Sequence, residues 1–492
     1  MSARNRADPH LINSFEGETM GISRRQFITS AASSLGLIAL SPRLGNAAAQ
    51  RAAMLRAAPV EQSIRAGAPR TNFWGFNGSV PGPLLRYRKG ESVRLSFQNA
   101  LDTESAVHWH GVRVPNAMDG VPYVTQNPVK PGEEFVYEFP LPDSGTFWYH
   151  PHQSSFEQVP RGLYGALIVE EERPIEVDRE LVWLLSDVRI GDDGLQIEDF
   201  GRILDIANDG RIGNEVLLNG SAAGAGNVLE VRSGERLRLR LINAAAARIF
   251  QLELHGHAMN VIAHDGQAVE PHVVERLVLG PGMRADLVVD CMQTPGSRFL
   301  MNDTHRRSAG PIASLVYVDA RPLRRKPLGA PMRLAPNRLV EPDLAKATEH
   351  YIMFQGGMRG APTMGIVDGK PVRSHELMER HGLAWTMNYT AQHEHALTHE
   401  PFLHLRRGEH VVLRMINETD FIHPMHLHGH FFRVLAVDGR KEARPVWRDT
   451  VIMGPRQTVD VAFVADNPGD WMYHCHILDH AAGGMMGTIR VV

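Results

Sequence analysis

Cys475 lies between His474 and His476, so three consecutive residues offer two kinds of metal ligand. Along an extended strand, successive side chains point to opposite faces, which places both histidines on one face and the thiol on the other. A thiolate with two imidazoles and a weak axial thioether defines a blue-copper electron-transfer site. Three further residues can complete such a set with Cys475: His423, His480 and Met485. We therefore expect a redox metal on the cysteine side and a second metal centre on the histidine side.

Four pairs of histidines share the spacing His-X-His. One such pair alone is more often two surface histidines, but four pairs at matched places in a repeat are hard to explain in that way. Both members of a pair point the same way from a strand, so two domains meeting face to face could gather all of them. Eight imidazoles are too many for one ion and predict a metal cluster. They are His108, His110, His150, His152, His426, His428, His474 and His476.

A diverged repeat with three copies must position these histidines. Each copy opens with a run in which apolar and polar residues alternate between turn residues, at 90–99, 234–243 and 408–417. This alternation predicts half-buried β-strands. Long helical periodicity is scarce, while 45 glycines and 31 prolines punctuate the chain. The sequence therefore predicts an all-β protein built from three β-sandwich domains.

The three copies differ in their ligands. Residues 145–152 match 469–476 position for position, with Pro151 in the place of Cys475. The middle copy carries other residues at three of the four equivalent histidine positions: Glu253, Met301 and Asp303. We therefore expect the middle domain to be a spacer without copper.

Length and charge bound the remaining interpretation. The 492 residues suggest roughly three domains at about 150 residues each. Charged and proline-rich stretches predict boundaries that give domains at 50–172, 173–325 and 326–492, the last including a linker. A net charge of −3 offers no argument for nucleic acid or an anionic membrane as a partner.

Residues 1–49 are expected to be an export signal outside the fold. The run Ser23-Arg24-Arg25-Gln26-Phe27-Ile28 resembles a twin-arginine signal, although a chance Arg-Arg pair is the alternative. The apolar stretch at 28–40 is too short to span a bilayer, and the alanines at 47–49 suit cleavage before Gln50. Met20 is an alternative start. We expect a periplasmic protein without a membrane span that meets the twin-arginine translocase during export.

The chain has only two cysteines, Cys291 and Cys475. If Cys475 binds a metal, no intramolecular disulfide can form. Cys291 follows an apolar strand-like run and is expected to be a buried structural thiol.

Together these motifs resemble those of the three-domain multicopper oxidases, the family of laccases and bacterial cuprous oxidases. The resemblance spans about residues 60 to 492, and no family ligand position is substituted. It implies three cupredoxin-like Greek-key β-sandwich domains and four copper ions. The motifs are His108-Trp109-His110-Gly111, His150-Pro151-His152, His423-Pro424-Met425-His426-Leu427-His428-Gly429, and the run from His474-Cys475-His476 to Met485.

The resemblance also implies a role for each ligand. His108 and His426 would bind the type 2 copper, and the other six paired histidines would bind the two type 3 coppers. The type 1 copper would take His423, Cys475 and His480, with Met485 axial. Electrons from a reducing substrate would pass from Cys475 through His474 or His476 to the cluster, where O₂ is reduced to water. The six type 3 ligands would be His110, His150, His152, His428, His474 and His476.

Two acid positions of the family bear on proton delivery. Asp119 falls nine residues after His110, where the family keeps a proton-relay acid. The alternative is a turn aspartate before Gly120. Many bacterial relatives carry a second acid directly after the last type 1 histidine, and this chain has Ala481 there. We therefore expect proton delivery to differ from theirs.

The electron donor is the least determined feature. We expect a laccase-like oxidase of phenols and aromatic amines that acts as a monomer. A metallo-oxidase for Cu⁺ or Fe²⁺ in copper tolerance is the alternative, and a non-enzymatic copper-binding protein is the third. The methionines before the third copy are spread rather than clustered, unlike a soft-metal cage: Met353, Met358, Met364, Met378 and Met387.

Two polar segments could serve a metal donor. Glu418 and Asp420, near His423, could bind a substrate or simply form a turn. The other segment could bind a metal substrate but resembles a solvated loop more closely; its residues are His393, Glu394, His395, His399 and His404.

Overall fold

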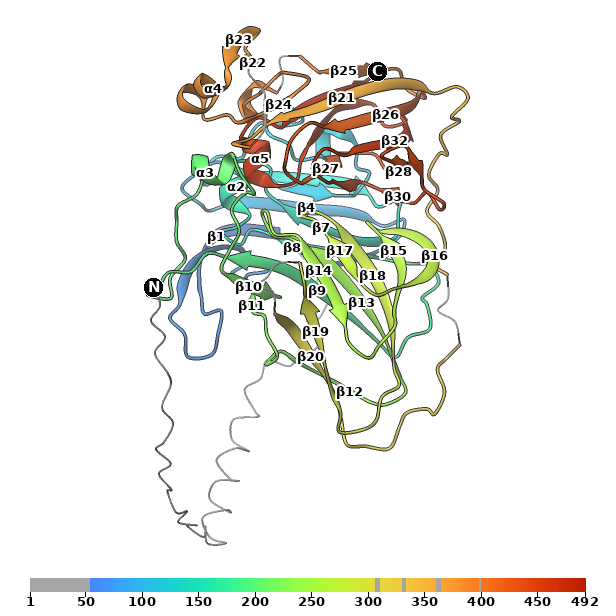
Figure 1. The fold of residues 1–492 in the computed structure, drawn as a ribbon. Helices are drawn as coiled ribbons and strands as arrows, with labels where there is room; N and C mark the ends of the chain where they lie inside the picture. The colour runs from blue at the N-terminus through green and yellow to red at the C-terminus, as the bar shows by residue number, and fades with distance from the viewer. Residues whose placement is uncertain (1–53, 306–309, 330–332, 360–363, 398–399) are drawn as a thin grey trace, which may run out of the picture. The chain divides into compact units, whose positions relative to one another are not determined.

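The computed structural model describes residues 54–492 apart from 306–309, 330–332, 360–363 and 398–399 (Figure 1). The expected signal peptide at 1–49 and His399 therefore lie outside the described residues. Strands dominate, and the described helices are short: η2 (Asn116–Met118), α2 (Ser155–Gln158), α3 (Ile203–Ile206), α4 (Ser374–His381), η3 (Glu394–Ala396) and α5 (Leu478–Ala482). In this part of the chain no helix has the length and apolar character to cross a bilayer.

The first part of the chain forms two four-stranded sheets, ordered β2-β1-β4-β6 and β3-β8-β7-β5. Their inward side chains, such as Phe97, Trp109 and Tyr137, form a buried apolar core. The strands are β1 (Met54–Gln62), β2 (Thr71–Phe76), β3 (Leu85–Arg88), β4 (Ser92–Asn99), β5 (His108–His110), β6 (Glu134–Pro140), β7 (Gly145–His150) and β8 (Gly165–Glu170).

The middle part forms a seven-stranded sheet, β11-β10-β9-β13-β18-β15-β16, and a five-stranded sheet, β12-β20-β19-β14-β17. A separate core cluster lies within it. The strands are β9 (Arg179–Val188), β10 (Glu215–Leu218), β11 (Ser221–Ala222), β12 (Val228–Val231), β13 (Glu235–Asn243), β14 (Phe250–Leu254), β15 (Met259–His264), β16 (Gln267–Val274), β17 (Leu277–Leu279), β18 (Arg284–Cys291), β19 (Arg298–Asp303) and β20 (Pro311–Tyr317).

The last part again pairs two sheets, β24-β21-β26-β32-β28-β29 with β30 beside β28, and β25-β34-β33-β27-β31, together with the hairpin β22-β23. One apolar cluster contains core residues of both the first and the last part of the chain. The strands are β21 (Thr348–Gly356), β22 (Met364–Val367), β23 (Lys370–Arg373), β24 (Trp385–Met387), β25 (Leu403–Leu405), β26 (His410–Asn417), β27 (His423–Leu427), β28 (Phe432–Val437), β29 (Arg440–Lys441), β30 (Trp447–Arg448), β31 (Thr450–Met453), β32 (Thr458–Val464), β33 (Gly469–Cys475) and β34 (Met486–Val491).

The predicted repeat is confirmed in the pairing of the strands. The three predicted runs form β4, β13 and β26. Each lies parallel to the first strand of its own part (β1, β9 or β21) and antiparallel to a later one (β6, β18 or β32). The same topology, used three times, is that of an all-β chain with three two-sheet sandwiches, as predicted.

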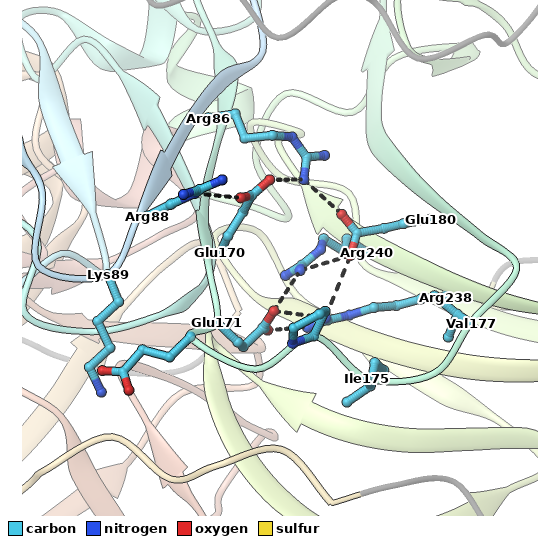
Figure 2. Close-up of a pocket in the computed structure, with 12 residues that line it drawn as sticks. Arg86, Arg88, Lys89, Glu170, Glu171, Ile175, Val177, Glu180, Arg238 and Arg240 are labelled. Carbon is cyan, nitrogen blue, oxygen red and sulfur yellow. Dashed lines mark hydrogen bonds and ion pairs between the residues drawn. The ribbon is translucent and has the colours of Figure 1, made fainter.

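The strand β13 differs from the prediction of a half-buried strand, because both of its faces are covered. Burial alternates along β4 and β26, whereas nearly every residue of β13 is buried. Its polar face holds Arg238 and Arg240, which pair with Glu171, Glu180 and Asp286. Of these groups, the two arginines and the two glutamates line a charged pocket of about 710 Å³, which Arg86 and Glu170 from the first part of the chain also line (Figure 2). Ion pairs thus cover a face that alternation alone assigns to solvent.

Candidate metal centres

The side chains of His423, Cys475 and His480 converge at one buried point, which we call the thiol site. His423 begins β27, Cys475 ends β33 and His480 lies in α5. The Cys475 Sγ lies 3.6 Å from His423 Nδ1 and 3.7 Å from His480 Nδ1, and the two Nδ1 atoms are 3.0 Å apart. Met485, fully buried, belongs to the same apolar cluster as Cys475. Two nitrogens and one sulfur thus face a common centre, as a type 1 copper requires.

The far nitrogen of each imidazole at the thiol site is held by a neighbour. His423 Nε2 shares a hydrogen bond of 2.8 Å with the Thr419 hydroxyl, and His480 Nε2 donates to the Asn208 carbonyl at 2.5 Å. These bonds leave both Nδ1 atoms as the acceptors that a metal ligand must be. Burial lowers the pKa of His480 to about 3, so its ring stays neutral. Burial also raises the pKa of Cys475, so a thiolate here needs a bound cation to stabilise it.

The eight paired histidines converge as well, and we call them the histidine cluster. In the first part of the chain, β5 pairs with β7 so that His108 lies opposite His150. In the last part, β27 pairs with β33 so that His426 lies opposite His474. The second histidine of each pair follows on the same face or just beyond the strand end. All eight side chains are buried, which leaves their nitrogens facing one another rather than solvent.

The ring nitrogens of the histidine cluster that make no hydrogen bond to a carbonyl group or a carboxylate are of two kinds. His152 Nε2 and His428 Nε2 lie 3.4 and 3.2 Å from His474 Nε2, a spacing at which one ion could bind all three. Seven further buried nitrogens have no hydrogen-bond partner among the described residues: His108 Nε2, His426 Nε2, His110 Nδ1, His150 Nε2, His152 Nδ1, His476 Nδ1 and His476 Nε2. Buried unpaired nitrogens are costly unless something binds them. The residues present therefore fit a group of metal ions.

Backbone carbonyls fix the other nitrogen of several rings. His108 Nδ1 donates to the Asp119 carbonyl and His426 Nδ1 to the Asp449 carbonyl, each at 2.8 Å. The ring of His474 donates in the same way to the carbonyl of the residue that follows it, at 2.8 Å. Such bonds set the tautomer that leaves Nε2 free to bind a metal. Burial lowers the pKa of His474 to about 4, so a proton does not compete for it near neutral pH.

Asp119 lies directly behind this cluster. It follows η2 and is 1% exposed. Its Oδ2 accepts a 2.9 Å hydrogen bond from His428 Nδ1, and its Oδ1 lies 3.2 Å from His108 Nδ1. One carboxylate therefore touches a histidine from each of the two halves of the cluster. This is more than a turn residue before Gly120 would do.

Asp449 is a second carboxylate at the cluster, and no sequence motif predicts it. Its Oδ1 lies 3.3 Å from His110 Nε2. Burial raises the pKa of Asp449 to about 6 against the opposing effect of Arg284, which donates to both of its oxygens at 2.8 and 2.6 Å. Arg284 begins β18 of the middle part and is fully buried. The middle domain is therefore more than a spacer, since it supports a histidine of the cluster.

The three middle-domain residues that replace histidines have other partners. Glu253 accepts from Arg276 at 2.7 Å, and Asp303 accepts from the Gln251 amide at 3.0 Å. The pairing register also differs by one residue, because Leu254 rather than Glu253 lies opposite Met301. A bulge between Met301 and Asn302 accompanies this shift.

Other residues singled out in the sequence lie away from both sites or are engaged. Glu418 accepts from Gln355 at 2.9 Å, and Asp420 pairs with Arg456 at 2.8 Å. Cys291 is buried, as expected. The rings of His393 and His395 stack, and Glu394 between them is half-buried, so this segment is not the fully solvated loop that was expected: it includes η3.

Comparisons with known proteins agree with this geometry. Three family models described as multicopper oxidase match residues 59–174, 193–320 and 371–492. Multicopper oxidase MmcO of Mycobacterium tuberculosis is 32% identical over 464 residues, covering 87% of this chain and 84% of that protein. Copper resistance protein A of Pseudomonas syringae pv. tomato is 27% identical over 570 residues, and the match covers 88% of this chain and 91% of that protein.

A solved structure is similar over most of the chain. The crystal structure of a multi-copper oxidase from Pseudomonas thermotolerans has a TM-score of 0.78 and 34% identity to this chain. The match covers 89% of this chain and 98% of that one. The similarity therefore includes the strands that carry both the thiol site and the histidine cluster.

Proposed function

The chain belongs to the multicopper oxidases, a family of copper-dependent oxidoreductases with cupredoxin-like domains, and from this premise we propose that it is a laccase-like oxidase of phenols and aromatic amines. Four one-electron oxidations of the donor would supply the reduction of one O₂, with four protons, to two waters. The observation that carries this proposal is the three-residue link between the thiol site and the histidine cluster. Cys475 faces one site, and its neighbours His474 and His476 face the other, so few covalent bonds separate them.

We propose the ligand assignment that the resemblance to the family implies. The thiol site would hold the type 1 copper, with Met485 as the weak axial ligand. His108 and His426 would hold the type 2 copper, and the other six histidines of the cluster would hold the type 3 pair. Bound copper would take up single electrons at the thiol site and deliver four of them to O₂ at the cluster. The protein's contribution is to orient these imidazoles, through burial and, for several of them, the carbonyl bonds described above.

Asp119 would hold and release protons beside the cluster. Its carboxylate touches His108 and His428 and is closed off from bulk water. A proton on Asp119 can therefore reach the reacting oxygen without crossing the apolar core. General acid–base groups in such positions typically contribute about 10² to 10⁴ in rate.

The surroundings of His480 support an organic donor. The ring is fully buried, and the middle-domain segment 206–208 lies over it, with the Ile206 carbonyl accepting from Trp385 Nε1 at 2.6 Å. An electron would enter through the Asn208 peptide by outer-sphere transfer. A phenol or aromatic amine needs no ligands for that step, whereas a metal ion would need several. The nearest acid in the sequence, Asp209, is already paired, because its carboxylate lies 3.7 Å from Arg359, so it offers a poor ligand for a metal ion.

A metallo-oxidase is the second candidate, and one residue favours it. Met358 is 53% exposed, and its Sδ lies 3.2 Å from Asn208 Nδ2, beside the point where electrons would enter. An exposed thioether there could receive Cu⁺. One relative of this chain is also named for copper resistance.

A direct comparison of donors tests the proposal. We would measure kcat/KM for 2,6-dimethoxyphenol and for Cu⁺ on one copper-loaded sample, with O₂ uptake as the readout. We expect the phenol to be the better donor in the wild-type protein and in Met358→Leu alike. A strong preference for Cu⁺ that disappears in Met358→Leu would favour the metallo-oxidase instead. A blue protein that consumes no O₂ with any donor would leave a copper-binding role.

We further propose that the protein is a monomer exported to the periplasm by the twin-arginine translocase. The basis is the Arg24-Arg25 motif and the apolar stretch after it. Replacing both arginines with lysine should retain the protein in the cytoplasm, as cell fractionation would report. Export unaffected by that change would contradict the proposal. Light scattering would measure the oligomeric state.

A further inference from the structure

Glu394 lies near the histidine cluster but takes no part in the function proposed so far. It begins η3, in the last domain, and its residue is only half-buried. Its Oε2 accepts a 3.1 Å hydrogen bond from the backbone N–H of Ser154. Ser154 follows His152, one of the type 3 ligands assigned above, by two residues. A carboxyl group from the last domain is thus anchored to the loop that carries a ligand of the first.

The same region contains the position at which relatives carry an acid. Ser154 precedes α2, and α2 packs against α5, which contains Ala481. Ala481 and Leu397 belong to one buried apolar cluster, and Leu397 ends the turn that Glu394 begins. The segment that contains Glu394 is therefore tied to the loop after His152 and, through Leu397, to the apolar cluster that contains Ala481. The chain lacks an acid at 481 but brings one to its neighbourhood from a different segment.

The two residues before Ser154 present buried polar atoms. His152 Nδ1 and Gln153 Oε1 are buried atoms with no hydrogen-bond partner among the described residues. Tyr123 also faces this region, and its hydroxyl donates to Glu104 at 3.5 Å. Burial raises the pKa of Tyr123, and the negative charges of Glu104 and Glu394 raise it further. These groups could connect Glu394 to the His152 loop through hydrogen bonds, directly or through water.

Glu394 has the acid strength that proton transfer near neutral pH requires. Burial of its side chain raises its pKa to about 7, opposed by the hydrogen bond from Ser154. The titratable neighbours on its own element are His393 and His395, of which His395 is exposed to solvent. A group whose pKa lies near the working pH is most effective as a proton donor and acceptor. The carboxyl group could therefore reload from solvent on one side and release protons toward the cluster on the other.

We infer that Glu394 is a second proton-relay acid for O₂ reduction, replacing in space the acid that this chain lacks at position 481. This inference rests on the proposed function, since it supplies protons to that reaction. The reduction of O₂ to two waters uses four electrons from the donor and four protons. Glu394 would pass protons from its carboxyl group toward the cluster, become a carboxylate, and take up replacements from solvent. Asp119 would serve the same cluster from beside His108 and His428.

A purely structural role predicts a different outcome upon substitution. If Glu394 only anchors the Ser154 N–H, then glutamine, which keeps an acceptor oxygen of the same reach, should replace it without loss. If Glu394 relays protons, glutamine should fail and aspartate should restore part of the function. Glu400, an exposed acid in the same segment, provides the matched control as Glu400→Gln.

Two measurements on the copper-loaded full chain test the inference. The first is stopped-flow reoxidation by O₂ after anaerobic reduction, across the pH range. In Glu394→Gln we expect reoxidation slower by about tenfold or more, without the pH dependence centred near 7, while reduction by the donor and the copper content stay as in the wild type. Glu394→Asp should recover part of the rate, and Glu400→Gln should match the wild type.

The second measurement does not depend on turnover. An infrared titration of the wild-type protein should show a carboxyl band that is lost on deprotonation near pH 7 and is missing in Glu394→Gln. Reoxidation of Glu394→Gln at the wild-type rate and pH dependence would overturn the inference, as would an infrared spectrum unchanged by the substitution. If the wild-type protein consumes no O₂, the proposed function fails, and the infrared titration alone still reports whether Glu394 holds a proton near pH 7.

Discussion

At the scale of single residues, a substitution of Asp119 can distinguish a role in metal binding from a role in proton transfer. In Asp119→Asn, the amide oxygen can still accept from His428 Nδ1, so the histidines keep their positions. The side chain can no longer donate and regain a proton. We expect copper content to be unchanged and kcat to fall by about 10² or more, measured as O₂ uptake against bound copper.

The exposed neighbour Asp102 provides the control for that change, because Asp102→Asn removes the same charge from the surface. Full activity in Asp119→Asn would show that Asp119 is a turn residue with no role in proton transfer. Loss of copper in the same variant would show that its role is to orient His108 and His428.

We expect Met485 to affect the reduction potential of the thiol site more than the arrangement of its other ligands. It is fully buried, and its backbone carbonyl accepts a 3.1 Å hydrogen bond from the Cys475 N–H. An axial thioether stabilises oxidised copper more than a hydrocarbon does, so Met485→Leu should raise the reduction potential of the type 1 copper. A redox titration of the blue absorption band measures this. A potential that stays the same or falls would mean that Met485 is no axial ligand.

At the scale of elements, β18 of the middle domain should stabilise the cluster through Arg284. Arg284 and Asp449 are both buried and doubly hydrogen-bonded to each other. In Arg284→Met, the Asp449 carboxylate loses its cation, which typically costs about 3–5 kcal/mol. We expect a lower free energy of unfolding and weaker copper retention, because His110 loses its fixed neighbour.

A matched change on the surface calibrates this effect. Arg276 is 66% exposed and pairs with Glu253, so Arg276→Met should cost at most about 1 kcal/mol. Denaturant unfolding would compare both variants with the double variant Arg284→Met/Asp449→Asn. The double variant should be more stable than the sum of its two single changes, since it leaves no unpaired charge. Additive losses would argue against the pairing.

The sequence could predict features that depend on residues close together in the chain, but not contacts between residues that are far apart in it. The proposed ligands follow short spacings along the chain, so alternation alone predicts that Cys475 lies on the opposite face from His474 and His476. Asp449 and Arg284 are 165 residues apart in the chain, and neither belongs to a short motif. Glu394 was noticed as part of a polar run, but its contact with Ser154 spans 240 residues. Those contacts depend on how the domains meet, which periodicity does not encode.

At the scale of the whole molecule, the middle domain participates in both metal sites without supplying a ligand in its histidine positions. Through Asn208 it holds His480 at the thiol site, and through Arg284 it holds Asp449 at the cluster. The cluster itself joins the first and last domains. Metal binding should therefore stabilise the association of all three domains, since a bound ligand stabilises the folded state that binds it.

Without copper, the free energy of unfolding of the chain should fall strongly as the pH falls. Nine of the ten histidines in the two sites have lowered pKa values, chiefly because of burial. Below about pH 6.5 such a ring binds a proton in the unfolded chain but stays neutral in the folded chain. Each ring therefore lowers the free energy of unfolding by up to about 1.4 kcal/mol for every pH unit by which the pH falls. Asp449, Asp479 and Glu394 have raised pKa values and oppose this trend, but they are fewer.

We expect the melting temperature of the chelator-treated protein to fall steeply from about pH 6.5 to 5, with the copper-loaded protein less affected because metal competes with protons for the same nitrogens. Calorimetry of both forms over this range measures the difference. The copper-loaded form should also melt at the higher temperature at every pH in the range. Parallel curves for the two forms would mean that these histidines do not exchange metal for protons, and that the stability of the domain assembly comes from its apolar core and ion pairs alone.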